Sequence, residues 1–118
     1  MLELIENICL KLKGTTQDIK WEQLCFLVGN KIYCMASLER PASVCFKIPK
    51  EEFDELTART GIAQASHMAR RQWVAVSDPQ ALDKGEWEHY LGQSYRLVLS
   101  KLSKKLQQEV LGEQSDFS

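Results

Sequence analysis

Hydrophobic residues recur at two different spacings along this chain, and the spacing separates predicted helices from predicted strands. Between Leu2 and Leu12 apolar side chains return at steps of three and four residues, which predicts an amphipathic helix. Gly14 can adopt the left-handed conformation that ends a helix, so we expect the helix to stop there. A polar stretch then leads to a first short strand near Ile19 and Trp21.

Three short apolar runs in the next part of the chain predict β-strands. Leu24–Val28 is apolar throughout, which is typical of a strand buried within a sheet. Gly29-Asn30 tolerates the positive φ of a two-residue hairpin turn, and Lys31–Ala36 is then the returning strand. After a proline-containing loop, Ser43–Ile48 is a third strand whose residues alternate between two faces. Together these runs predict a small antiparallel sheet.

The middle of the chain leaves the sheet and returns to it. Pro49 suits the first turn of a short acidic helix, and Gly61 is its natural end. The segment from Ile62 to Met68 fits neither a helix nor a strand clearly. Trp73–Val76, in contrast, has the aromatic and β-branched content of a further strand.

The C-terminal part of the chain predicts one long helix. Asp83 followed by Glu86 has the spacing of an N-terminal capping box, and apolar residues then recur at helical spacing as far as Leu106. The order helix, three strands, helix, strand and long helix predicts an α+β fold with helices packed on a mainly antiparallel sheet. We expect one domain over residues 1–111 and a flexible polar tail over residues 112–118.

The distribution of charge is more informative than the total. The net charge is −1, so the chain lacks the basic excess of a strong nucleic-acid binder. Basic residues nevertheless gather in three segments, separated by acidic blocks, at positions 31–50, 59–71 and 96–105. A fold that separates these blocks would present a basic face.

Two features of the sequence bear on its cellular compartment. No apolar run approaches the length of about 18 residues that predicts a membrane span. The first residues carry Glu3 and Glu6 where a secretory signal carries basic residues, so we expect a cytoplasmic protein without a membrane partner.

The four cysteines are predicted to be buried, reduced thiols. Cys9, Cys25, Cys34 and Cys45 lie among apolar neighbours and form no C-x-x-C pair. The alternative is a disulfide between Cys34 and Cys45, whose strands could lie side by side in an oxidising compartment.

Motifs that carry known chemistry are absent, which lowers the expectation of an enzyme. The sequence contains no dinucleotide-binding, P-loop, nucleophile-elbow or zinc-protease motif, and we expect neither a cofactor nor a catalytic residue. His67 and His89 have no spaced partners that would complete a metal site. Glu51 and Glu55 lie four residues apart on one helical face, beside Glu52 and Asp54, which makes cation binding an alternative to a solvated surface.

The segment from His67 to Trp73 is the most suggestive short stretch. Arg70 and Arg71 could bind phosphate oxygens, and the indole of Trp73 could stack on a base. The alternative is that Trp73 belongs to the core and that the two arginines lie on a solvated loop.

Four segments of the chain, taken in order, resemble the MmcQ/YjbR family of small bacterial proteins. They are LCFLVGNKIYCM, ASVCFKIPKEEFDEL, HMARRQWVAV and QSYRLVLSKLSKK, and the similarity covers residues 14–105. The resemblance implies a CyaY-like (frataxin-like) α+β fold, in agreement with the order of elements above.

The resemblance also implies DNA binding, since family members are commonly described as DNA-binding through a double-wing arrangement of hairpins. The family's basic and aromatic positions fall at Lys31, Lys47, Arg70, Arg71 and Trp73 in this sequence. We therefore expect a non-enzymatic protein that binds double-stranded DNA through these residues.

Two other functions stay open at this stage. One is an interaction module for a protein or small ligand, with Tyr33, Met35 and Trp73 as surface anchors. The other is the binding of a cation by the acidic helix.

Overall fold

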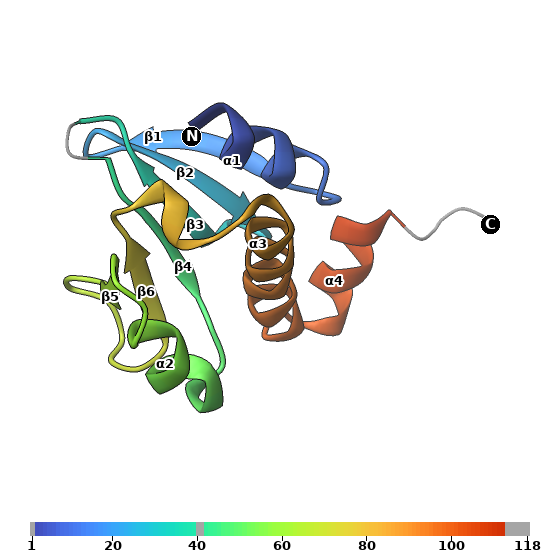
Figure 1. The fold of residues 1–118 in the computed structure, drawn as a ribbon. Helices are drawn as coiled ribbons and strands as arrows, with labels where there is room; N and C mark the ends of the chain where they lie inside the picture. Colours follow the sequence, from blue (N-terminus) through green and yellow to red (C-terminus); the bar gives the residue numbers. More distant parts are fainter. Residues whose placement is uncertain (1, 40–41, 113–118) are drawn as a thin grey trace.

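The computed structural model describes residues 2–39 and 42–112, which form an antiparallel sheet with helices on one face (Figure 1). The elements in chain order are α1 (Leu2–Leu10), β1 (Thr16–Lys20), β2 (Gln23–Val28), β3 (Lys31–Ser37), β4 (Val44–Lys47), α2 (Lys50–Thr57), β5 (Ile62–Gln64), β6 (Trp73–Val76), the 3₁₀ helix η1 (Pro79–Ala81), α3 (Lys84–Ser100) and α4 (Lys104–Leu111). The predicted α+β fold is confirmed. Across the described residues, no helix is both long and apolar enough to cross a membrane.

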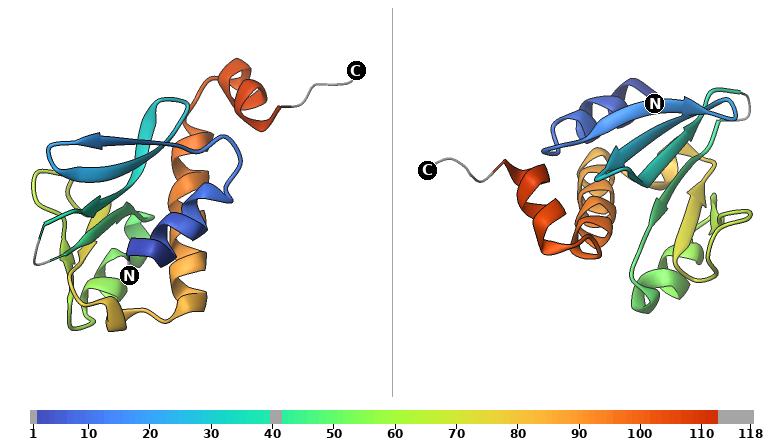
Figure 2. Two further views of the ribbon diagram at one scale, coloured as in Figure 1. Left: turned by 90° about the horizontal axis from the view of Figure 1, so that it is seen from above. Right: turned by 180° about the vertical axis from the view of Figure 1, so that it is seen from behind.

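The six strands lie in the order β1-β2-β3-β4-β6-β5, and each neighbouring pair is antiparallel. The left panel of Figure 2 shows α1 and α3 beside each other on one face of this sheet. Phe46 of β4 belongs to the buried layer between the sheet and α3, where its ring packs against Trp87 and Tyr90. The preceding cross-strand row, which contains Met35 and Cys45, is only partly buried, since it points to the other face.

The C-terminal helix begins as predicted but ends earlier. Asp83 and Glu86 form the predicted capping box at the start of α3. The prediction of one helix as far as Leu106 is wrong, because α3 ends at Ser100 and α4 starts after Ser103. The hydroxyl of Ser103 accepts a hydrogen bond from the backbone N–H of Leu106, so a new N-cap stands where the apolar spacing continues unbroken.

Smaller corrections concern the strands and the termini of the elements. The first strand is β1, and Trp21 lies after it in the turn to β2 with a positive φ of 51° and 83% of its surface exposed. The segment from Ile62 to Met68, whose sequence fitted neither a helix nor a strand clearly, begins with the short edge strand β5. Helix α1 ends at Leu10 rather than at Gly14. Gly112 is the left-handed C-cap of α4, and the rest of the predicted tail lies outside the described residues.

The cysteines are all free thiols, as expected, and the alternative disulfide is wrong. Cys34 pairs with Phe46 across β3 and β4, whereas Cys45 pairs with Met35. The two thiols therefore lie in adjacent rows that point to opposite faces of the sheet. Burial raises the pKa of the Cys34 thiol well above its usual value and also raises the pKa of Cys45.

Tyr33 and Trp73 are both buried, with 0% and 8% of their surfaces exposed, which contradicts their predicted role as surface anchors. Tyr33 belongs to the core. Its side chain is fully buried, and its ring packs edge-on against Tyr95 of α3. Its hydroxyl donates to the carbonyl oxygen of Cys9 and shares a hydrogen bond with the hydroxyl of Thr15. Tyr33 thus ties β3 to α3 and to the end of α1.

Candidate functional site

Strands β3 and β4 separate at one end of the sheet, and a side chain of α3 lies between them. Their pairing joins Cys34–Ala36 to Val44–Phe46. One position further on, the backbone N–H of Lys47 donates to Ser94 Oγ at 2.9 Å, and Ser94 Oγ donates to the carbonyl oxygen of Tyr33 at 2.6 Å. The buried hydroxyl of Ser94 therefore replaces a direct backbone hydrogen bond between the two strands.

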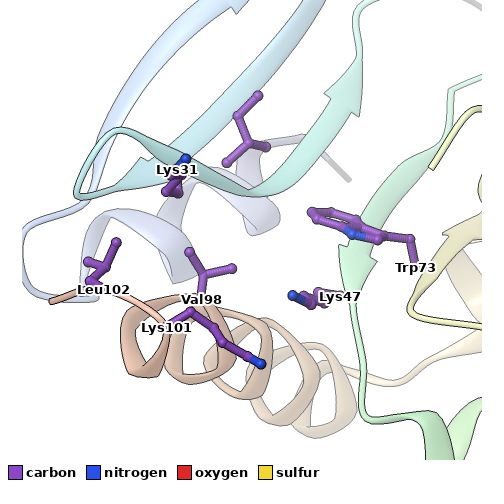
Figure 3. Close-up of a pocket in the computed structure, with 7 residues that line it drawn as sticks. Lys31, Lys47, Trp73, Val98, Lys101 and Leu102 are labelled. Atoms are coloured by element: carbon purple, nitrogen blue, oxygen red, sulfur yellow. The ribbon is translucent and has the colours of Figure 1, made fainter. Parts of the chain in front are cut away.

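A pocket of about 220 Å³ lies where the strands part, lined by Lys31, Ile32, Lys47, Trp73, Val98, Lys101 and Leu102. In Figure 3, Lys47 and Trp73 reach into this space from one side and Lys31 lies on the other, above the C-terminal end of α3. Three lysines and four apolar residues therefore line the same pocket.

Local structure explains how these side chains meet. Lys47 of β4 and Trp73 of β6 are cross-strand partners, which places both on the same face of the sheet. Lys31 opens β3 directly after the Gly29-Asn30 turn. Lys101 is the C-cap of α3, where a cation complements the negative end of the helix dipole.

A second pocket, of about 350 Å³, continues from the first. Its lining consists of Lys47, Ile48, Pro49, Lys50, Gln72, Leu97 and Lys101, so the two pockets share Lys47 and Lys101. We name this surface the lysine groove and define it by Lys31, Lys47, Lys50 and Lys101. No aspartate or glutamate is among the residues that line either pocket.

Of the residues expected to bind DNA, the structure brings Lys31, Lys47 and Trp73 together and places the two arginines elsewhere. Arg71 makes a two-pronged ion pair with Asp54 of α2, at 2.9 and 3.0 Å, and its guanidinium lies over the ring of Phe53. The hydrogen bonds and charge of Arg71 hold the pKa of the Asp54 carboxyl below its usual value. Arg70 is exposed in the same loop and lines neither pocket.

The sequence does not predict the contribution of α3 to this site. It places Lys50 and Lys101 only within two of the basic segments, 31–50 and 96–105. One signal was present in the sequence: Ser94 interrupts the apolar stripe of α3, and a serine in such a stripe needs a buried hydrogen-bond partner.

The acidic helix offers no assembled metal site. Asp54 is bound to Arg71, and Glu52 accepts a hydrogen bond from Gln93 of α3. Over residues 2–39 and 42–112, no three His, Cys, Asp or Glu side chains gather in a group that could hold a metal ion.

Comparisons with known proteins place the chain in a family. A YjbR family model matches residues 10–97. Protein DR2400 of Deinococcus radiodurans, which carries a DUF419 domain, has a similar structure, with a TM-score of 0.84 and 22% identity over 93% of this chain and 87% of that one. A protein from Pseudomonas syringae gives a TM-score of 0.66 and 21% identity over 81% of this chain and 96% of its own. A search of curated proteins finds no match. Because the YjbR model covers most of its length, the chain belongs to the YjbR family, the MmcQ/YjbR family that its sequence resembles.

Proposed function

We propose that this protein is a non-enzymatic DNA-binding protein whose lysine groove holds the phosphates of double-stranded DNA. The observation that carries the proposal is the convergence of Lys31, Lys47, Lys50 and Lys101 on two adjoining pockets that no acidic side chain lines. These lysines come from three separate parts of the chain. A near-neutral protein thereby gains a local basic surface, and phosphate neutralisation supplies most of the free energy of non-specific DNA binding.

The arrangement of the groove fits a phosphate backbone. Lys31, Lys50 and Lys101 are exposed, while Lys47 is half-buried between them. Lys31 follows the turn of the β2–β3 hairpin, which is the element that a double-wing arrangement would place against a groove of the duplex. The two described ion pairs involve Arg59 and Arg71, and neither involves a lysine of the groove.

Salt dependence tests this proposal quantitatively. If each of the four lysines neutralises one phosphate, the logarithm of the association constant should fall with the logarithm of salt concentration at a slope of about −3.6, or −0.9 per phosphate. Fluorescence anisotropy of a labelled duplex, measured from low to physiological salt, gives this slope. Absence of binding at low salt, or binding that does not respond to salt, would refute the proposal.

A charge-matched pair of variants locates the contact. Lys47→Gln/Lys101→Gln should weaken binding and reduce the slope by about 1.8. Lys11→Gln/Lys84→Gln removes the same charge from a separate pocket beside α1 and should leave the slope unchanged. Equal losses in both variants would show that net charge, rather than the groove, drives binding.

The role of the two arginines stays a prediction that the same assay tests. Arg70→Gln removes an exposed cation outside the groove, and Arg71→Gln removes one that already has Asp54 as a partner. We expect a smaller effect on DNA affinity from either arginine variant than from the lysine pair.

A further inference from the structure

The lining of the smaller pocket combines apolar and cationic side chains. The apolar residues of the lining are Ile32, Trp73, Val98 and Leu102, and the cationic ones are Lys31, Lys47 and Lys101. Apolar cavities of about 150 Å³ can hold a benzene molecule, and this pocket, at about 220 Å³, has more room. A phosphate backbone alone would use the three lysines and leave the apolar side chains without a partner.

The three lysines of the pocket lack carboxylate partners among its lining residues. No acidic residue contributes to the lining, and the two ion pairs found in residues 2–39 and 42–112 use other cations. Like charges that gather at one opening repel each other, and a bound anion relieves this repulsion. The pocket is therefore complementary to a ligand with both an apolar part and a negative charge.

We propose that this pocket binds a small organic anion, an aromatic ring that bears a phosphate or carboxylate group, with the ring against Trp73 and Val98 and the anionic group on Lys31, Lys47 and Lys101. The pocket shares these three lysines with the proposed DNA surface. A ligand in the pocket thus competes with DNA, and this last consequence alone rests on the proposed function.

Three probes separate the two halves of the pocket: 1-naphthyl phosphate carries both features, inorganic phosphate only the charge, and 1-naphthalenemethanol only the ring. Binding is followed through the indole N–H resonance of Trp73, which is assigned with the Trp73→Phe variant, while the resonance of buried Trp87 reports on the fold. We expect naphthyl phosphate to bind at least tenfold more tightly than either single-feature probe. Equal affinity for naphthyl phosphate and either of the others, or no change at Trp73, would overturn the proposal.

A pocket-filling variant distinguishes this site from the DNA surface. Leu102 is half-buried between α3 and α4, and Leu102→Phe places a larger side chain in the pocket while it retains every lysine. We expect at least a tenfold loss of affinity for naphthyl phosphate and less than a twofold change for duplex DNA. Unchanged affinity for naphthyl phosphate in a folded variant would contradict the proposal.

A measurement on the wild-type chain does not depend on the folding of any variant. Nuclear Overhauser contacts from the naphthyl protons to the methyl groups of Val98 and Ile32 are expected, and contacts only to other methyl groups would place the probe elsewhere. Displacement of labelled duplex by naphthyl phosphate then tests the competition. Naphthyl phosphate binding without any DNA binding would leave the pocket assignment standing and refute the proposed function, and the reverse result would do the opposite.

Discussion

Gly29, in the turn between β2 and β3, lies directly against Leu102, at the junction of α3 and α4. A Cβ atom added to Gly29 would come within 2.5 Å of Leu102 Cδ1. The residue also has a φ of +58°, which L-amino acids with a side chain adopt at a cost. The hairpin and the helix junction, which both contribute residues to the small pocket, are thus in close contact at a glycine.

Gly29→Ala is expected to lower the free energy of unfolding by about 1–2 kcal/mol, because the left-handed backbone disfavours a Cβ. Urea denaturation measures the change. Gly85→Ala is the control, since a Cβ there has only an ordinary contact of 3.5 Å with Asp83 Oδ1, and replacing a helical glycine by alanine should stabilise α3 by up to about 1 kcal/mol. Equal effects of the two substitutions would contradict the conformational argument.

Ser94→Ala is expected to destabilise the protein by about 1–3 kcal/mol, since it leaves the Lys47 N–H and the Tyr33 carbonyl without their shared partner. The denaturation midpoint of this variant should fall well below that of Ser100→Ala, which removes an exposed hydroxyl from the same helix. Identical midpoints would show that water or backbone movement satisfies both groups.

The turn between β1 and β2 is expected to tolerate, and to benefit from, a change of sequence. Trp21 and Glu22 both have positive φ, 51° and 62°, in a two-residue loop closed by the pair Lys20 and Gln23. Replacing Trp21-Glu22 by Asn-Gly supplies the residues that this turn geometry favours and should stabilise the protein by about 1 kcal/mol. A lower denaturation midpoint in this double variant would refute the prediction.

The ion pair between Asp54 and Arg71 gives a defined pH dependence. Since the folded protein lowers the pKa of Asp54, the contribution to stability is present above the unfolded-state pKa of about 3.9 and is lost as the pH falls through the lower folded value. NMR titration of the Asp54 carboxyl should show a higher pKa in Arg71→Gln than in the wild type. Arg70→Gln is the control and should leave that pKa unchanged.

Local signals in the sequence predicted the parts of the fold that depend on local interactions. The capping box at Asp83 and Glu86 and the Gly29-Asn30 turn each involve neighbouring residues, and both appear as predicted. The break before Ser103 was missed because Val98, Leu102 and Leu106 keep a helical spacing across it. Neither a glycine nor a proline marks the point, and only the N-cap serine does.

The candidate site could be predicted only in part, because its geometry depends on a tertiary feature. Lys31, Lys47 and Trp73 came from the family resemblance, and the structure brings them to one pocket. Lys101 joins this pocket only because β3 and β4 separate beside the end of α3. This separation is a tertiary feature that no short stretch of sequence predicts. Arg71 was expected at the site because it lies near Trp73 in the sequence. The sequence did not predict its ion pair with Asp54, which places it elsewhere.

The insertion of Ser94 also constrains the order in which the chain can reach its final structure. The residues that it joins precede it by 61 and 47 positions, so both leave the ribosome well before α3 exists. The first four strands can associate early through hairpins, but the connection between Tyr33 of β3 and Lys47 of β4 has to wait for α3. Ser94 of α3 therefore completes the middle of the sheet after its strands have been synthesised. A truncated chain that ends before α3 would contain β3 and β4 without the hydroxyl that bridges Tyr33 and Lys47.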